Sequence, residues 1–417
     1  MPVAPEKRSM AASDISLASD QVSFKKRRTD NDECTSSDSE NVKSHIRDFS
    51  APFIKDEPDN LERRARLSIF STYPRSEQHW NEDGNLVLCA EKTLLCVHRG
   101  VLKRHTTVFC YLEEHNVLDD GHAGVQTVVT AELERLHGNP VVRVKGTLKA
   151  WEELLDALYQ PYYFLKPINS SDFRRLKDLL STATLYRFYG VRKQALSSLN
   201  KLIPTTLDAY LKNSSPVALH DLCAAIPDLY RYNAPLFLPF VYLSIISKHS
   251  HLDIPGLPSH LLSFRDKCHA LSGAMEVLHQ QQETSFKFFM DQRARKSVIP
   301  ASACSCGITC LQRALPNMSP STTYDPITYI MPFVSCEVYI DDLRKHFFCA
   351  GALQAMRQSH TAGREDMWER LPRCFDLGTW DELKEEQEVD NQAPTPIATN
   401  ASSRRDRRVR EYQEATR

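Results

Sequence analysis

Three cysteines within seven residues are the densest group of metal-binding side chains in the sequence. The segment CSCGITC contains Cys304, Cys306 and Cys310. A structural zinc ion takes four soft ligands, which commonly come as two close pairs. Cys336 or His346 could supply a fourth ligand, but no second close pair of cysteines completes the set. The spacing by itself leaves metal binding open.

A reduced thiol cluster in a surface loop is the interpretation that we favour for this segment. Pro300 and Pro316 bracket the loop, and the cysteine spacing departs from the usual zinc patterns. We therefore expect no metal and no other cofactor. The N-terminal residues MPVAPEKR lack the apolar core of a secretory signal peptide, which predicts an intracellular protein with reduced thiols. Other cysteines stand among apolar residues, where a thiol packs as a small hydrophobe: Cys89, Cys96, Cys110, Cys223, Cys268, Cys349 and Cys374.

His98 invites a catalytic interpretation, because histidine titrates near neutral pH. A catalytic histidine needs a nucleophile or a metal and an orienting carboxylate, and no such set surrounds it in the sequence. The motifs G-x-x-x-x-G-K-[ST], G-x-G-x-x-G, H-E-x-x-H and G-x-S-x-G are absent as well. We therefore expect a structural role for His98 and a protein that is not an enzyme.

Two short motifs lie close to the N-terminus. Lys25, Lys26, Arg27 and Arg28 form a basic tetrapeptide, which is typical either of a nuclear import patch or of a solvated charge run. Lys55 lies in the sequence IKDE, which resembles a SUMO acceptor site. We expect the protein in the nucleus or the cytoplasm, with the nucleus favoured.

Length and composition constrain the elements that must position these residues. The chain has 417 residues, 41% of them hydrophobic, and a formal net charge of −1. This length fits two to three domains, and the balanced charge gives no argument for nucleic acid or an anionic membrane. The longest apolar run, Ala234–Ile246, is shorter than the roughly 20 residues of a membrane-spanning helix. Residues 1–60 and 385–417 are predicted to be disordered because they are rich in charge and poor in apolar side chains.

Short apolar runs predict two strands around a tight polar turn, at residues 85–90 and 94–98. A helical turn at 99–104 follows, and then a helix at 106–112 with Thr106 as its N-cap. The further predicted elements are a strand at 140–145 and helices that include 151–159, 176–183 and 191–199, with a break at 186–190. This order of elements predicts an α+β fold with a small sheet flanked by helices.

The run from Asp83 to Phe109 resembles the BTB/POZ domain, especially that of the BTB proteins expanded in mushroom-forming fungi. In this resemblance His98 follows the second strand of the family and braces the turn into the next helix. The segment LLDALYQP is similar to the family helix that ends in Leu-Tyr-x-Pro. The residues that carry the resemblance are Asp83, His98, Leu102, Phe109, Leu158 and Tyr159.

The sequence departs from the family in three places. Asn85 takes the strand position at which the family commonly has a dimer-interface Asp, and Asp83 lies two residues earlier. Thr106 and Thr107 replace the usual pair of serines. Residues 119–138 form an insertion beside the surface through which some BTB domains engage a cullin, which argues against that activity.

The resemblance implies a protein-interaction module without catalytic activity that forms a homodimer. Related BTB domains dimerise through apolar faces of their first helices, in a self-complementary two-fold contact. One alternative is a substrate adaptor of a cullin-type ubiquitin ligase, with contacts around 111–116 and 172–203. Another is a nuclear regulator that binds a corepressor. Protein partners are expected, and neither nucleic acid nor a membrane. The apolar candidates, which sequence cannot divide between core and partner surface, are Val101, Leu102, Val108, Tyr111 and Leu112.

These observations predict four regions: an arm at 1–60, a BTB/POZ domain at 80–205, a helical region at 206–384 and a tail at 385–417. The helical region is expected to pack back onto the BTB/POZ domain. Leu343, Phe347, Ala350 and Leu353 recur at helical spacing within it. Prolines are expected to separate its short helices: Pro204, Pro216, Pro227, Pro235, Pro255 and Pro258.

Overall fold

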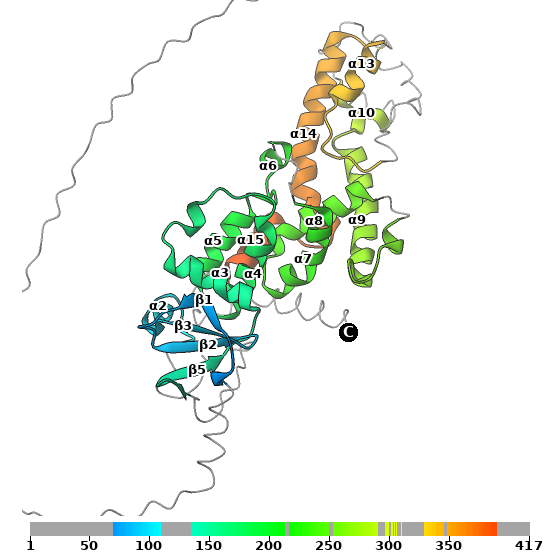
Figure 1. Ribbon diagram of the computed structural model, residues 1–417. Coiled ribbons are helices and arrows are strands. Elements are labelled where there is room, and N and C mark those ends of the chain that lie inside the picture. Colours follow the sequence, from blue (N-terminus) through cyan, green and yellow to red (C-terminus); the bar gives the residue numbers. More distant parts are fainter. Residues whose placement is uncertain are drawn as a thin grey trace, which may run out of the picture. The chain divides into compact units, whose positions relative to one another are not determined.

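The computed structural model has an α+β fold in which a five-stranded sheet is followed by a long series of helices (Figure 1). This confirms the predicted fold class. The chain divides into units Met1–Asp56 and Glu57–Arg417, and everything described below belongs to the second unit. The basic tetrapeptide at 25–28, Lys55 and most of the insertion at 119–138 lie outside the described residues. The structure describes residues 70–109, 135–212, 217–249, 253–290, 297–299, 302, 304, 306, 310, 329–345 and 348–389.

The centre of the sheet is the predicted hairpin. Strands β2 (Leu86–Ala90) and β3 (Thr93–Val97) pair in antiparallel register, and Glu91 and Lys92 form the turn with positive φ angles of 46° and 69°. Strand β5 (Asn139–Arg143) returns parallel to β2. Every residue of β2 is buried, so this strand is covered on both faces and its sequence is a continuous apolar run without alternation.

Two edge strands are additions to the predicted sheet, whose order is β1-β3-β2-β5-β4. Strand β1 (Arg75–Trp80) pairs parallel to β3, although its sequence RSEQHW has no apolar alternation that would predict a strand. Strand β4 (Arg135–Leu136) forms a hairpin with β5 through His137 and Gly138, which have φ angles of 51° and 88°. The predicted insertion therefore ends in a sheet element.

Helix α2 (Arg99–His105) confirms the predicted helical turn after β3. Thr106 caps the C-terminus of α2, where its backbone N–H donates to Leu102 O. Its hydroxyl accepts the N–H of Val108 at 3.2 Å and donates to Tyr186 O at 2.7 Å. Thr106 thus fastens this turn to a distant helix end, and the rest of the predicted helix at 106–112 lies outside the described residues beyond Phe109.

Three further helices match the predicted apolar stripes: α3 (Leu148–Tyr159), α4 (Asp172–Leu185) and α5 (Tyr189–Leu199). Between α4 and α5, Arg187 has a φ angle of 56°, which accounts for the predicted break at 186–190. Trp151 and Tyr186 pack edge to face with ring centroids 4.7 Å apart beside Phe109. These rings anchor the helices to the turn after α2.

The remainder of the described chain is helical, as predicted for 206–384. Pro227 lies inside α7 (Leu219–Arg231) and does not separate two helices as predicted, because the buried Ile226 and Leu229 hold α7 against its neighbours. The predicted stripe from Leu343 to Leu353 spans two helices, because α13 (Glu337–Lys345) ends before α14 (Ala350–Cys374) begins. The helices are α6 (Leu207–Lys212), α7 (Leu219–Arg231), α8 (Leu238–Lys248), α9 (Phe264–Glu283), α10 (Lys287–Met290), α13 (Glu337–Lys345), α14 (Ala350–Cys374) and α15 (Trp380–Val389).

One apolar core continues from the sheet through α3, α4 and α5 into α7, α8 and α9. Ion pairs join α4 to α7 at the surface of this core, between Arg174 and Asp221 at 2.7 Å and between Lys177 and Asp228. The helical region therefore does pack onto the predicted domain at 80–205. Helix α15 contributes Leu383 to the same core and runs past the expected boundary at 384.

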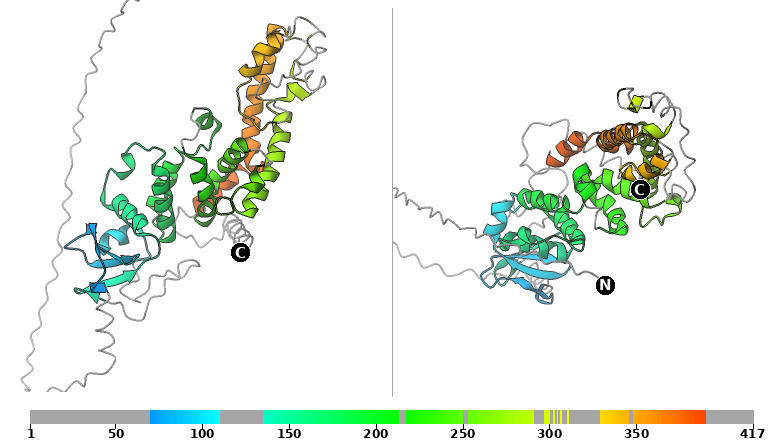
Figure 2. Two further views of the ribbon diagram at one scale, coloured as in Figure 1. Left: turned by 45° about the vertical axis from the view of Figure 1, so that its right-hand side comes forward. Right: turned by 90° about the horizontal axis from the view of Figure 1, so that it is seen from above.

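A second, smaller core lies where α10, α13 and the first turns of α14 meet. Phe286, Phe288 and Phe289 are buried in it. Helices α9 and α14 run alongside each other and connect the two cores (Figure 2). In the part of the chain that the structure describes, no helix combines the length and apolarity needed to cross a membrane.

Candidate functional site

His98 lies between two side chains that occupy both of its ring nitrogens. Its Nε2 is 3.0 Å from Asp83 Oδ1, and its Nδ1 is 3.0 Å from the Tyr159 hydroxyl. The backbone N–H of His98 donates to the same hydroxyl at 3.0 Å, so the Tyr159 O–H is left to donate to Nδ1. In the neutral imidazole the proton is then on Nε2, which donates to Asp83.

This arrangement joins the end of β3 to the last residue of α3. The hydrogen bond with His98 lowers the pKa of Asp83, and burial raises the pKa of Tyr159. Asn85 Oδ1 accepts the backbone N–H of Arg99 at 2.8 Å and completes the turn into α2. Three of the side chains predicted to identify the domain, Asp83, His98 and Tyr159, therefore brace one turn, and both ring nitrogens of His98 are engaged.

The structure also divides the apolar candidates around α2. Leu102 and Val108 are buried in the main core, and so is Phe109. Val101 is partly exposed on α2, whereas Tyr111 and Leu112 lie outside the described residues. Of the predicted partner surface, Val108 thus belongs to the core and Val101 remains accessible.

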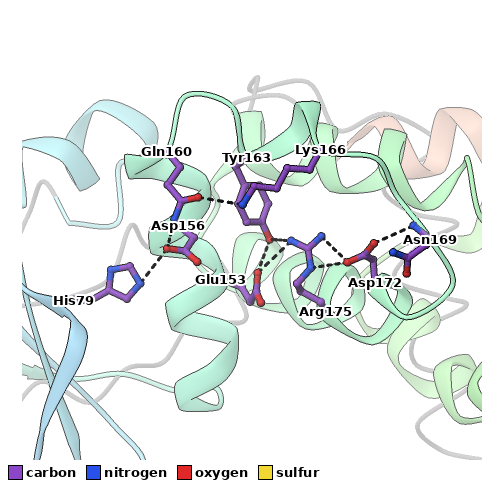
Figure 3. A network of polar contacts seen from close by, with 9 residues as sticks. All are labelled: His79, Glu153, Asp156, Gln160, Tyr163, Lys166, Asn169, Asp172 and Arg175. Atoms are coloured by element: carbon purple, nitrogen blue, oxygen red, sulfur yellow. Dashed lines mark hydrogen bonds and ion pairs between the residues drawn. The ribbon is translucent and has the colours of Figure 1, made fainter.

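A polar network surrounds the segment that follows α3 (Figure 3). The Tyr163 hydroxyl donates to Glu153 Oε2 at 2.6 Å, and Arg175 of α4 donates to the same hydroxyl at 2.6 Å. Arg175 also pairs with Asp172 at 2.9 Å. On the other side of the segment, His79 of β1 contacts Asp156 of α3 at 3.4 Å. The network therefore joins β1, α3 and α4.

The segment held by this network presents two exposed apolar side chains. Tyr163 begins the short 3₁₀ helix Tyr163–Leu165 and is buried. Its neighbours Tyr162 and Leu165 are 72% and 75% exposed. Apolar side chains that are exposed on a rigid support are typical of protein contact sites. Sequence reasoning missed this pair, because only the contacts of Tyr163 distinguish the buried aromatic residue from the exposed one.

The cysteine segment forms a compact group with a residue that the sequence did not associate with it. The Sγ atoms of Cys304, Cys306, Cys310 and Cys349 all lie within 4.8 Å of one another. The sulfurs of Cys304 and Cys349 are 3.3 Å apart. Cys304 and Cys310 are buried and Cys306 is exposed, so the expectation of a cluster in a surface loop is wrong for two of its three members.

The fourth member, Cys349, is the N-cap of α14. Its Sγ accepts the backbone N–H of Ala352 at 3.4 Å. Burial raises the pKa of Cys349, but this hydrogen bond and those from the three other thiols outweigh it and bring the pKa to about 6. The N-terminus of a helix stabilises a thiolate in this way.

The burial of the other cysteines agrees only in part with the prediction. Cys336, which was considered as a fourth ligand, is buried in the second core and is no member of the four-cysteine group. Cys268 is exposed and does not pack in a core as expected. The predicted burial is confirmed for Cys89, Cys96, Cys223 and Cys374, whereas Cys110 and the other candidate ligand, His346, lie outside the described residues.

Comparison with protein-family models finds no match for the sequence, and comparisons with curated proteins and with solved structures find none either.

Proposed function

We propose that the protein is a BTB-like interaction module that forms a homodimer and has no catalytic activity. The observation that carries this proposal is the order and direction of the sheet elements. The β2–β3 hairpin leads into α2, β5 returns parallel to β2, and α3, α4 and α5 follow. This is the order of elements that the resemblance at Asp83–Phe109 and at the helix ending in Leu158 and Tyr159 implies.

The contacts of His98 support a structural use of the one histidine that the resemblance singles out. Both ring nitrogens and the backbone N–H are engaged by Asp83 and Tyr159. A general base needs a free nitrogen that faces a reacting group.

The dimer contact is assigned to the face of α2 that carries Val101. This side chain is partly exposed, while Leu102 beside it is fully buried. A two-fold contact places the same side chain on both sides of the interface, so one apolar residue contributes twice. A charge introduced there is also brought close to its own copy, which makes the substitution doubly unfavourable for association.

The test is the mass of the intact protein in solution by light scattering at micromolar concentration. We expect twice the 47.6 kDa of one chain. The variant Val101→Glu should shift the mass to that of one chain without loss of helical circular dichroism. Met275→Glu is the matched control, because Met275 is 65% exposed on α9, outside the domain, and should leave the dimer intact. An unmodified protein with the mass of a single chain contradicts the proposal.

The alternative functions stay predictions. The cullin-adaptor function depends in part on residues 111–116, and the nuclear function depends on Lys25–Arg28 and Lys55, all outside the described residues. Both are compatible with a dimer, so the light-scattering test addresses the homodimer and not the choice between these partners.

A further inference from the structure

We propose that Cys304, Cys306, Cys310 and Cys349 bind one zinc ion as a closed, tetrahedral, structural site. The proposal rests on the position of four sulfur atoms, all within 4.8 Å of one another, which come from two segments 45 residues apart between Cys304 and Cys349. It is independent of the proposed dimer.

The separation of the sulfurs fits a single ion. A Zn–S bond is about 2.3 Å, and a regular tetrahedron with that radius has edges of about 3.8 Å. The sulfurs of Cys304 and Cys349 are 3.3 Å apart, and no pair of the four sulfurs is more than 4.8 Å apart. Adjustments of an ångström or less at the side chains therefore produce the coordination geometry.

The ligand set selects among metals by its chemistry. Four thiolates in a tetrahedron are typical of zinc or of iron, whereas calcium and magnesium need oxygen ligands. An iron–sulfur cluster distributes its four cysteines over several iron atoms, which requires thiols that are farther apart than in this compact group. All four positions of a tetrahedron are filled by protein, so no position is open for a substrate, and the site is structural.

The position of Cys349 gives the site a second source of stabilisation. Four thiolates carry four negative charges against the two positive charges of the ion, so the site needs nearby positive potential. The first turn of α14 supplies it, since this 25-residue helix directs the N–H of Ala352 at the Cys349 sulfur. Binding replaces the remaining thiol protons, which are released to solvent.

The bound ion would link the cysteine segment to the start of α14, next to the second core. Cys304 and Cys310 are themselves buried members of that core, together with Phe286 and Tyr339. A small core gains more from a metal cross-link than a large one, because it buries too little apolar surface to offset the entropy of the chain around it. Metal loss is therefore expected to loosen α13 and the start of α14 before the main core.

The experiment measures the metal content of the purified 417-residue protein by inductively coupled plasma mass spectrometry. We expect one zinc per chain, released stoichiometrically by an organomercurial that titrates thiols. Replacement by cobalt should give the intense visible absorption of a tetrahedral tetrathiolate complex. These measurements use the unmodified protein, so they do not depend on whether a variant folds.

Variants identify the ligands. Cys306→Ser and Cys349→Ser should each lower zinc retention in a competing chelator by at least tenfold, and Cys306 is exposed, so its replacement leaves the cores intact. Cys268→Ser, at another exposed cysteine, and Cys336→Ala should retain one zinc per chain. The light-scattering mass should be the same for all four variants, which separates this result from the dimer.

Three results would overturn the proposal. Metal-free protein with four reactive thiols identifies a simple thiol cluster. A mass deficit of two hydrogen atoms without metal identifies a disulfide. Zinc that survives Cys349→Ser, or that is lost on Cys336→Ala, identifies a different ligand set.

Discussion

Arg175 is the residue on which the polar network around Tyr163 depends. Its guanidinium reaches the Tyr163 hydroxyl, Asp172 and, at 3.4 Å, Glu153, and its side chain is only 22% exposed. Two carboxylates that are 15% and 19% exposed share this one cation. Loss of the cation would leave both partly buried acids without their partner, which is costlier than loss of an exposed ion pair.

We therefore expect Arg175→Met to lower the free energy of unfolding by about 1–3 kcal/mol, in a urea titration followed by circular dichroism. Hydrogen exchange should increase at residues 160–166 in particular. The neighbouring Arg174→Met is the control, since Arg174 is 68% exposed and pairs with Asp221 at the surface, where ~0–1 kcal/mol is expected. Equal effects of the two substitutions would contradict the role given to the network.

At the scale of elements, the contact between α14 and the end of α9 depends on one glycine. A Cβ atom at Gly363 would lie 2.5 Å from the carbonyl carbon and oxygen of Thr284 and 2.8 Å from the Cα of Ser285. These atoms belong to the backbone and cannot rotate away. Beside this contact, His360 lies 2.8 Å from Ser285 O and 2.8 Å from Val334 O, so the helix is fixed on both sides.

Gly363→Ala should consequently destabilise the protein by about 1–3 kcal/mol, because the two elements must separate to admit the methyl group. On intrinsic helix propensity alone the same change would stabilise by about 1 kcal/mol, so the sign of the effect is diagnostic. Gly190→Ala in α5 is the control, because a Cβ there meets nothing within 4 Å. Thermal unfolding of both variants checks this, and a stabilised Gly363→Ala protein would refute the close contact.

At the scale of the whole molecule, α15, the last helix among the described residues, is held by residues from two distant segments. Arg192 of α5 donates to Asn233 O at 2.7 Å and to Gln387 O at 3.3 Å. Asn233 Nδ2 donates to Glu386 O at 2.7 Å. Carbonyls 386 and 387 are in the last turn of α15, and a cation near the C-terminal end of a helix is favourable.

Arg192→Met should remove this cap and cost about 1.5–3 kcal/mol of unfolding free energy, since Arg192 is 1% exposed and its hydrogen bonds are charge-assisted. Hydrogen exchange should increase in α15 although the substitution is in α5. Lys193→Met, at the exposed neighbouring position, should change neither quantity. Unchanged exchange in α15 of the Arg192→Met protein would refute the coupling of these segments.

The elements that sequence predicted correctly are those whose signal is local. The β2–β3 hairpin, β5 and helices α3, α4 and α5 follow from apolar runs, helical stripes and turn residues that are adjacent in the chain. The break between α4 and α5 was predicted for the same reason. Local patterns suffice there because each element buries its own apolar side chains.

Tertiary structure decided what depends on partners far away in the chain. Strand β1 has no apolar pattern and exists through its pairing with β3, and the end of α15 depends on Arg192 and Asn233. The fourth cysteine of the cluster was beyond sequence reasoning for the same reason. Cys349 lies beside Cys304 because α14 begins next to the cysteine segment, and spacing along a chain does not encode that approach.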